Sequence, residues 1–233
     1  MIIAAHRGAS KAERENTVAA FERARAMGAD MVELDVRRTA DGALIVHHDA
    51  SIAGLGPIVG IPRDALPPYV PDLSVALDAC GGMDVNVEIK SDPDEPDYDA
   101  DQWLAHRVAE LLQSRSDAAR MLVSSFDFDT IGVVRSMSPS LRTGFLCTRL
   151  RPDASTLISR VVEAGHEALH PLHLAVNRAL VEEAHAAGLR VNTWTVDDPD
   201  RIRELASWGV DAVITNVPDV ARAALGARRT GGN

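Results

Sequence analysis

The 233-residue chain contains few cysteines, few aromatic residues and no long apolar run. Its two cysteines, Cys80 and Cys147, lie far apart and cannot form a disulfide framework, which favours a reducing compartment. No apolar segment approaches the roughly 20 residues that a membrane-spanning helix needs. The apolar start at residues 1–5 is too short for a signal peptide and lacks a basic leader. We therefore expect a cytoplasmic protein without stable membrane insertion.

Positive charge is also scarce, with 24 Lys and Arg against 34 Asp and Glu and a formal net charge of −10. Nucleic-acid binding depends on clustered Lys and Arg side chains, and because no such cluster occurs we expect no nucleic-acid partner. The 46% of hydrophobic residues is enough for the core of one large α/β domain. We expect this domain to span residues 1–226 and residues 227–233 to form a frayed tail.

Short apolar segments alternate with amphipathic segments along the whole chain. Strands are expected near residues 3, 33, 87, 122, 144, 169, 193 and 213. Helices are expected over 17–27, with Asn16 as its N-cap, and over 73–80, 103–115, 127–137, 153–164, 178–187, 199–208 and 217–225. Residues 51–71, rich in Gly and Pro, form an irregular insertion after the second strand. Eight such units predict a single closed (β/α)8 TIM barrel. A doubly wound open sheet is the alternative, but no glycine-rich dinucleotide turn follows the first strand.

Two acidic residues interrupt the second expected strand. Glu33 and Asp35 are two positions apart, so their side chains point to the same face. Paired acids on a buried face repel each other and are unfavourable to desolvate, so a cation is needed between them. Glu88 on the third strand completes an oxygen-rich set that suits a hard divalent cation, Mg²⁺ or Ca²⁺. Ordinary ion pairs with the nearby Arg37 and Arg38 are the alternative.

Other chemically active residues also follow expected strands, where the active site of a TIM barrel lies. His6 and His48 can transfer protons near neutral pH, although a buried structural role is the alternative for His6. The planar guanidinium of Arg7 suits a phosphate, and Lys90 adds a mobile positive charge. A metal, cationic donors and two histidines indicate phosphodiester cleavage. The metal and Arg7 would hold phosphoryl oxygens, while one histidine deprotonates the nucleophile and the other protonates the leaving oxygen.

Three further patterns have simpler explanations. Residues 166–170 match the zinc-protease pattern H-E-x-x-H, but Gly165 and Pro171 break the helix that this motif needs, so we expect a strand. His47 alternates away from the pocket face and is expected to be structural. The acidic run over 92–101 lacks the mid-loop glycine and terminal glutamate of an EF-hand, so we expect a solvated surface loop.

Nine short motifs occur in a characteristic order. They are His6-Arg7-Gly8, Glu15-Asn16-Thr17, Glu33-Leu34-Asp35-Val36, Asp41-Gly42, His48-Asp49, Val87-Glu88-Ile89-Lys90, Ser125-Phe126-Asp127, Trp194-Thr195-Val196 and Thr215-Asn216-x-Pro218. Together they resemble the glycerophosphodiester phosphodiesterase family, in its small bacterial cytoplasmic form. The resemblance implies a metal-dependent TIM barrel that hydrolyses small glycerophosphodiesters to sn-glycerol 3-phosphate and an alcohol.

The resemblance also implies a role for each candidate residue. The implied metal ligands are Glu33, Asp35 and Glu88, the implied acid–base pair is His6 and His48, and the implied substrate contacts are Arg7, Lys90, Phe126 and Trp194. Related two-histidine phosphodiesterases use an internal hydroxyl as nucleophile, which makes a cyclic phosphate intermediate one hypothesis.

Residues 51–56 depart from the family, which often carries an Arg-Thr-Thr-Gly-like run there, so the identity of the leaving alcohol stays open. Apolar residues in the insertion would also suit an entrance for lipids and a lysophospholipase D-type activity. They are Ile52, Leu55, Ile58, Val59 and Ile61. A catalytically silent barrel that binds a phosphorylated ligand is the other alternative, but the presence of both histidines and all three acids argues against it.

Overall fold

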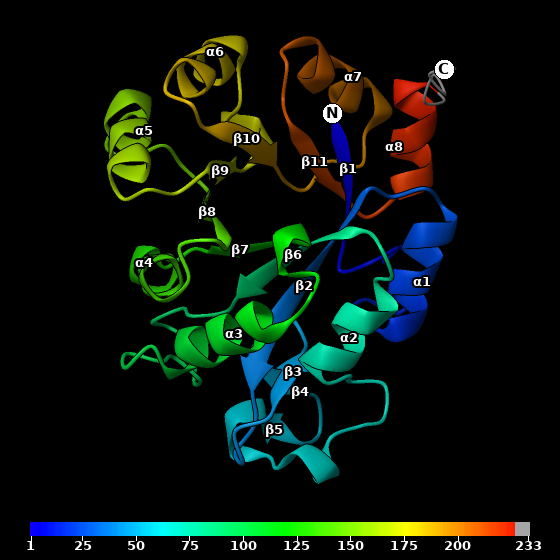
Figure 1. The fold of residues 1–233 in the computed structure, drawn as a ribbon. Helices are drawn as coiled ribbons and strands as arrows, with labels where there is room; N and C mark the ends of the chain where they lie inside the picture. Colours follow the sequence, from blue (N-terminus) through cyan, green and yellow to red (C-terminus); the bar gives the residue numbers. More distant parts are fainter. Residues whose placement is uncertain (227–233) are drawn as a thin grey trace.

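Eight parallel strands close into a barrel in the computed structural model, which describes residues 1–226 (Figure 1). The strands are β1 (Ile2–His6), β2 (Met31–Arg38), β6 (Asp84–Ile89), β7 (Met121–Ser125), β8 (Arg142–Cys147), β9 (Ala168–Pro171), β10 (Arg190–Thr193) and β11 (Ala212–Thr215). Because β1 pairs with both β2 and β11, the sheet has no open edge between these eight strands. The predicted TIM barrel is confirmed, and the tail expected at 227–233 lies outside the described residues.

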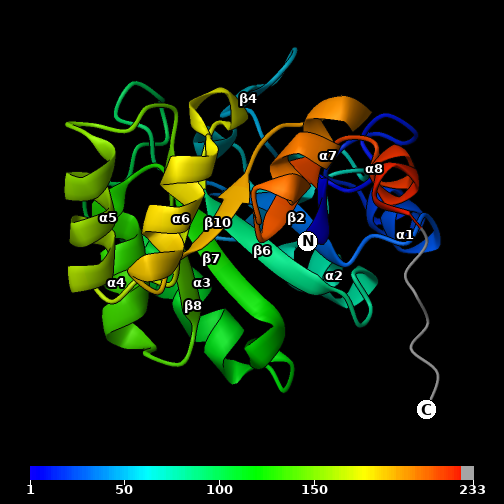
Figure 2. The same cartoon turned by 90° about the horizontal axis from the view of Figure 1, so that it is seen from above.

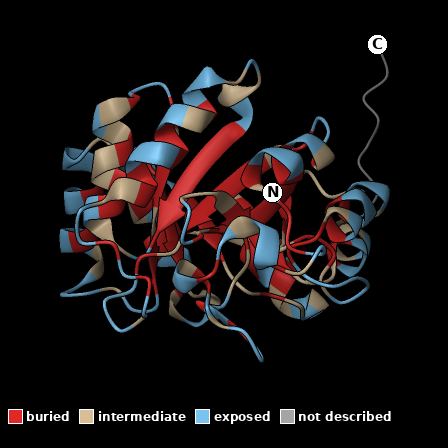
Figure 3. Ribbon diagram, turned by 90° about the horizontal axis from the view of Figure 1, so that it is seen from below, coloured by how far each residue is buried: buried red, intermediate tan, exposed pale blue. Residues whose placement is uncertain are grey.

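A helix follows each barrel strand, and the ring of helices is visible from above in Figure 2. The helices are α1 (Val18–Ala26), α2 (Leu73–Ala79), α3 (Trp103–Ser114), α4 (Phe128–Met137), α5 (Ala154–Glu163), α6 (Arg178–Ala186), α7 (Pro199–Ser207) and α8 (Pro218–Leu225). Two clusters of buried apolar side chains fill the space between helices and strands. Figure 3 shows the resulting pattern, with buried strands inside and exposed residues on the outer helix faces. None of the helices within residues 1–226 combines the length and apolar character that crossing a bilayer requires.

The insertion after β2 is more regular than expected. It contains β3 (Leu44–Val46), antiparallel to the end of β2, and a hairpin of β4 (Ser51–Ile52) and β5 (Gly56–Pro57). Two single turns of 3₁₀ helix follow, η1 (Ile58–Gly60) and η2 (Arg63–Ala65). The insertion has a hydrophobic core of its own, made of Ile45, Ile52, Ile58, Ile61, Leu66 and Val70. The three isoleucines of the suggested lipid entrance pack on one another instead, whereas Leu55 is half exposed, so the lipid alternative stays a prediction.

The acidic loop over 92–101 is exposed at Asp92, Asp94 and Asp101, as predicted for a solvated surface loop, but it is anchored through two other acids. Asp97 and Asp99 are buried. The guanidinium of Arg37 is also buried, and its Nη1 donates to both carboxylate oxygens of Asp97 at 2.8 and 2.7 Å. The same guanidinium donates from Nε and Nη2 to the backbone carbonyl of His48 at 2.8 and 2.6 Å. Arg37 therefore joins the acidic loop to the segment that carries His48.

Candidate active site

Strand register brings the three acids together. His6 on β1 lies opposite Glu33 on β2, and Glu33 and Asp35 lie opposite Asn86 and Glu88 on β6. Strand alternation turns these side chains toward the barrel interior, while the intervening residues join the core under the helices. Oxygens of Glu33, Asp35 and Glu88 consequently lie within 4.8 Å of one another, and all three residues are buried.

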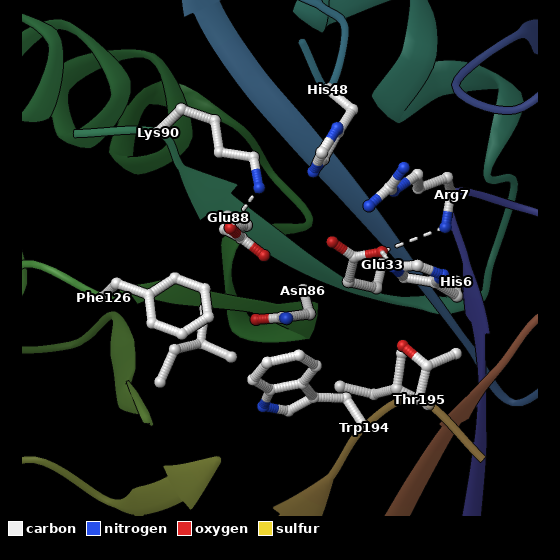
Figure 4. A pocket seen from close by; sticks show the side chains of 12 residues that line it. His6, Arg7, Glu33, His48, Asn86, Glu88, Lys90, Phe126, Trp194 and Thr195 are labelled. Atoms are coloured by element: carbon white, nitrogen blue, oxygen red, sulfur yellow. Dashed lines mark hydrogen bonds and ion pairs between the residues drawn. The ribbon is translucent and has the colours of Figure 1, made fainter. Parts of the chain in front are cut away.

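Two cationic side chains lie against this triad. The Nζ of Lys90 is 2.9 Å from Asp35 Oδ1 and also pairs with Glu88 (Figure 4). The Nε of Arg7 is 3.2 Å from Asp35 Oδ2, and its backbone N–H donates to Glu33 Oε2 at 2.9 Å. Although burial opposes it, Lys90 and Arg7 hold the pKa of Asp35 well below its ordinary value. Lys90 is therefore paired with two carboxylates, and the mobility of its charge stays a prediction.

The neighbouring arginines do not neutralise the triad. Arg37 pairs with Asp97, and Arg38 lies 3.7 Å from Asp99, so neither forms the ordinary ion pair considered from the sequence. Glu33 remains the least compensated acid, because its Oε1 has no hydrogen-bond partner among the described residues. Burial, together with the adjacent Asp35 and Glu88, raises the pKa of Glu33 well above its ordinary value. Three buried carboxylates facing two cations fit a divalent metal bound through oxygen.

The asparagine expected to cap α1 supports the triad instead. Thr17 is the N-cap, and its hydroxyl accepts the backbone N–H of Ala20. Asn16 has a left-handed backbone with φ of 56°, which asparagine tolerates better than most residues. Its Nδ2 donates to Asp35 Oδ2 at 2.8 Å. The predicted N-cap is therefore wrong, and Asn16 orients a carboxylate.

The two histidines lie on different walls of one pocket (Figure 4). The Nδ1 of His6 is 2.7 Å from Oδ1 of Asn216, whose amide nitrogen is committed to Asp197 at 2.7 Å. His6 Nδ1 must then donate, which leaves Nε2 as the acceptor. Burial and the charge of Arg7 lower the pKa of His6, so the ring is neutral at pH 7. Because His6 lines the pocket with Nε2 as an acceptor, its position argues against a purely structural role in the core.

His48 has a different partner from His6. Its Nδ1 lies 2.7 Å from Oδ1 of Asp49, so a carboxylate rather than an amide lies behind this ring. The neighbouring His47 does not line the pocket, and its Nδ1 lies 2.9 Å from the carbonyl of Asp49. The two catalytic candidates therefore differ in the charge of the group behind each ring.

An apolar wall faces the charged groups across a cavity of about 230 Å³. Phe126, Leu146, Trp194 and Ile214 form this wall. The rings of Phe126 and Trp194 meet edge to face, with centroids 5.5 Å apart. The indole N–H of Trp194 donates to the carbonyl of His170, so the ring presents carbon to the cavity. Both aromatic residues lie where the sequence places them.

Residues 166–170 do not form the helix that the zinc-protease pattern needs. His166 precedes β9 and its Nδ1 lies 2.9 Å from the hydroxyl of Thr143. His170 lies on β9 and its Nε2 is 2.9 Å from Nδ2 of Asn192. The two histidines have separate partners, and the predicted strand is confirmed. Sequence reasoning missed Asn16, Asn86 and Asn216 as site residues, although each occurs inside or beside a motif that carries an acid or a histidine.

A closed barrel with acids, cations and two histidines at the carboxyl ends of its strands defines an enzyme of phosphate-ester chemistry. The sequence model of the glycerophosphoryl diester phosphodiesterase family matches residues 6–220. The chain belongs to this family, whose members are phosphoric diester hydrolases, and it is such a hydrolase.

Individual relatives agree with the family. The chain is 29% identical to a glycerophosphodiester phosphodiesterase of Caldanaerobacter subterraneus, covering 94% of this chain and 95% of that protein. It is 28% identical to one of Bacillus subtilis, covering 94% and 85%. Among solved structures, an Oleispira antarctica phosphodiesterase in complex with the product sn-glycerol-3-phosphate shares the fold with a TM-score of 0.87 at 23% identity, covering 97% and 96%. The Thermotoga maritima glycerophosphodiester phosphodiesterase gives 0.81 at 24% identity, covering 94% and 96%.

Proposed function

We propose that this enzyme hydrolyses glycerophosphodiesters to sn-glycerol 3-phosphate and an alcohol, with a bound divalent metal and two histidines as acid and base. The observation that carries the proposal is the buried triad of Glu33, Asp35 and Glu88, two of whose members line the same pocket as both histidines, with Glu33 Oε1 lacking a partner among the described residues. The family supports the substrate class, as does the product named in the Oleispira antarctica structure.

The triad would hold Mg²⁺ or Ca²⁺ through its carboxylate oxygens. When bound, such an ion polarises a phosphoryl oxygen and offsets the charge that develops on it. The guanidinium of Arg7 borders the same pocket and would donate to a second phosphoryl oxygen, while Lys90 supports both the triad and the phosphate. Phe126 and Trp194 would exclude water from the organic part of the substrate.

The partners of the histidines favour one assignment of acid and base. His6 is neutral and its Nε2 is an acceptor, so it would remove a proton from the attacking hydroxyl, either a substrate hydroxyl or water. His48 has the Asp49 carboxylate behind it, so it would carry the proton that the leaving oxygen needs. Under this assignment His48→Ala recovers more activity than His6→Ala when the leaving group is p-nitrophenol, which needs no proton.

We also propose that residues 1–226 form one functional unit, and a cytoplasmic location stays a prediction that the two free cysteines favour.

The decisive experiment measures release of sn-glycerol 3-phosphate from glycerophosphocholine and glycerophosphoethanolamine in Mg²⁺, Ca²⁺ or EDTA. We expect release that EDTA abolishes and that Glu33→Ala lacks. Asp94→Asn, which removes an exposed acid of the nearby loop, is the matched control and keeps full activity. Absence of release from the folded parent enzyme with either metal contradicts the proposal, and release from lysophospholipids alone points to the lipid alternative.

A further inference from the structure

Asn86 has no role in the mechanism above, yet it lines the same pocket. It lies on β6 two residues before Glu88, which places it about 6–7 Å deeper in the barrel along the strand. Figure 4 shows its side chain between the acidic groups and the ring of Trp194. Among the residues that line the pocket it is the only amide, and it lies where the charged side meets the apolar wall.

Both polar atoms of this amide lack a hydrogen-bond partner within the described chain, although the residue is only 1% exposed. Buried amides are nearly always hydrogen-bonded, because an unpaired donor or acceptor is unfavourable by roughly 1–3 kcal/mol. A group that lines a ligand pocket is normally paired with the ligand. The Asn86 amide therefore indicates which hydrogen-bonding groups a ligand has at this depth of the pocket.

The amide needs both an acceptor for Nδ2 and a donor for Oδ1. A phosphoryl oxygen accepts only, and a metal ion would serve Oδ1 only, so neither satisfies the whole amide. A hydroxyl both donates and accepts, and a vicinal diol supplies two. Leu146 and Ile214, which line the same pocket, offer no hydrogen-bond partner for such hydroxyls.

We propose that Asn86 is a specificity-determining residue that binds the hydroxyls of the glyceryl unit. This inference rests on the proposed function. The glyceryl unit is common to all glycerophosphodiesters, so it suits a fixed amide at the bottom of a small cavity, whereas the variable alcohol extends toward solvent. An alkyl group in the same place would leave the amide unpaired, and the enzyme therefore discriminates polyol from alkyl phosphates.

The test compares sn-glycerol 3-phosphate with propyl phosphate, which differs only by lacking the two hydroxyls. Calorimetric titration in the presence of Ca²⁺ gives the ratio of the two dissociation constants. We expect the parent enzyme to bind the glyceryl compound about tenfold more tightly, in line with one or two net hydrogen bonds. In Asn86→Leu, which keeps the side-chain shape, the ratio falls to near one because affinity for the glyceryl compound alone declines.

Thr193→Val is the matched control, because Thr193 is a fully buried residue of β10 that does not line the pocket and whose hydroxyl already donates to the carbonyl of Pro171. It should leave the ratio unchanged. If Asn86→Leu does not fold, Asn86→Ala adds no bulk and must show the same loss. The inference is overturned if the ratio of dissociation constants is near one in the parent or stays tenfold in the Asn86 variants. It is also overturned if Asn86→Leu loses tenfold in Ca²⁺ affinity, because Asn86 would then be a metal ligand. Failure of the parent to bind either phosphate or to hydrolyse any glycerophosphodiester overturns the proposed function itself, which is a different result.

Discussion

Replacing Arg37 by leucine should affect both stability and catalysis, and the two effects can be separated. The guanidinium and its bidentate partner Asp97 have side chains only 1% and 4% exposed. Removing one partner of such a buried pair destabilises a protein by roughly 3–5 kcal/mol, because the other charge stays buried and unpaired. Glu95, the second partner, is 33% exposed and adds little. We therefore expect Arg37→Leu to lose about 3–5 kcal/mol of unfolding free energy.

The catalytic effect has a different origin. Arg37 provides two donors to the carbonyl of His48, and without them the backbone of the proposed acid is free to move. A displacement of about 1 Å can reduce the rate about 100-fold, so kcat should fall by one to two orders of magnitude with a smaller change in KM.

Urea unfolding and initial rates on glycerophosphocholine would measure these effects. The double variant Arg37→Leu/Asp97→Leu should recover part of the stability, because it no longer buries an unpaired charge, but none of the activity, because His48 stays unanchored. Arg107→Leu is the control, since Arg107 forms an exposed helix pair that contributes less than about 1 kcal/mol. A loss below about 1 kcal/mol in Arg37→Leu, or additive losses in the double variant, would refute the reasoning.

Two further predictions follow from buried titratable groups. Glu33→Gln should abolish metal-dependent activity. In EDTA it should nevertheless raise the melting temperature by a few degrees, because it removes the buried carboxylate that its neighbours compensate least. A lower melting temperature would contradict this prediction. Burial lowers the pKa of His170 to about 3. As the pH falls below about 6.5, His170 therefore becomes protonated in the unfolded chain while it stays neutral in the folded protein. The free energy of unfolding is therefore unaffected by this residue above about pH 6.5 and decreases as the pH falls toward 3. The decrease amounts to about 2 kcal/mol at pH 5. Urea unfolding measures how much the free energy of unfolding decreases between pH 7 and pH 5. This decrease should be smaller by about 2 kcal/mol in His170→Gln than in the parent, and equal decreases in the two proteins would exclude the effect.

Local patterns were sufficient to predict the barrel and most of the site. The alternation over 31–36 places Glu33 and Asp35 on one face whatever the rest of the chain does, and apolar periodicity places the helices. What failed depended on contacts between distant residues. Arg37 and Asp97 are 60 positions apart, so their pairing follows from how the loop folds back and from no local pattern. Asn16 fits the N-cap preference equally well, and only the position of β2 gives its amide a better partner in Asp35.

The separate core of the insertion has a consequence for how this enzyme could change. No described residue of that core belongs to the clusters packed between barrel and helices, so residues 51–70 can vary in length and sequence with little repacking of the barrel, whereas Val46 of β3 is part of the barrel core. His48 lies just before this segment and is tied to β2 through Arg37, whereas the proposed metal ligands and His6 lie on barrel strands. The proposed metal ligands and His6 are thus fixed by the barrel scaffold, while the proposed acid His48 is followed by a segment that has a core of its own. Grafting residues 51–70 between relatives would test whether this segment sets the leaving-group preference.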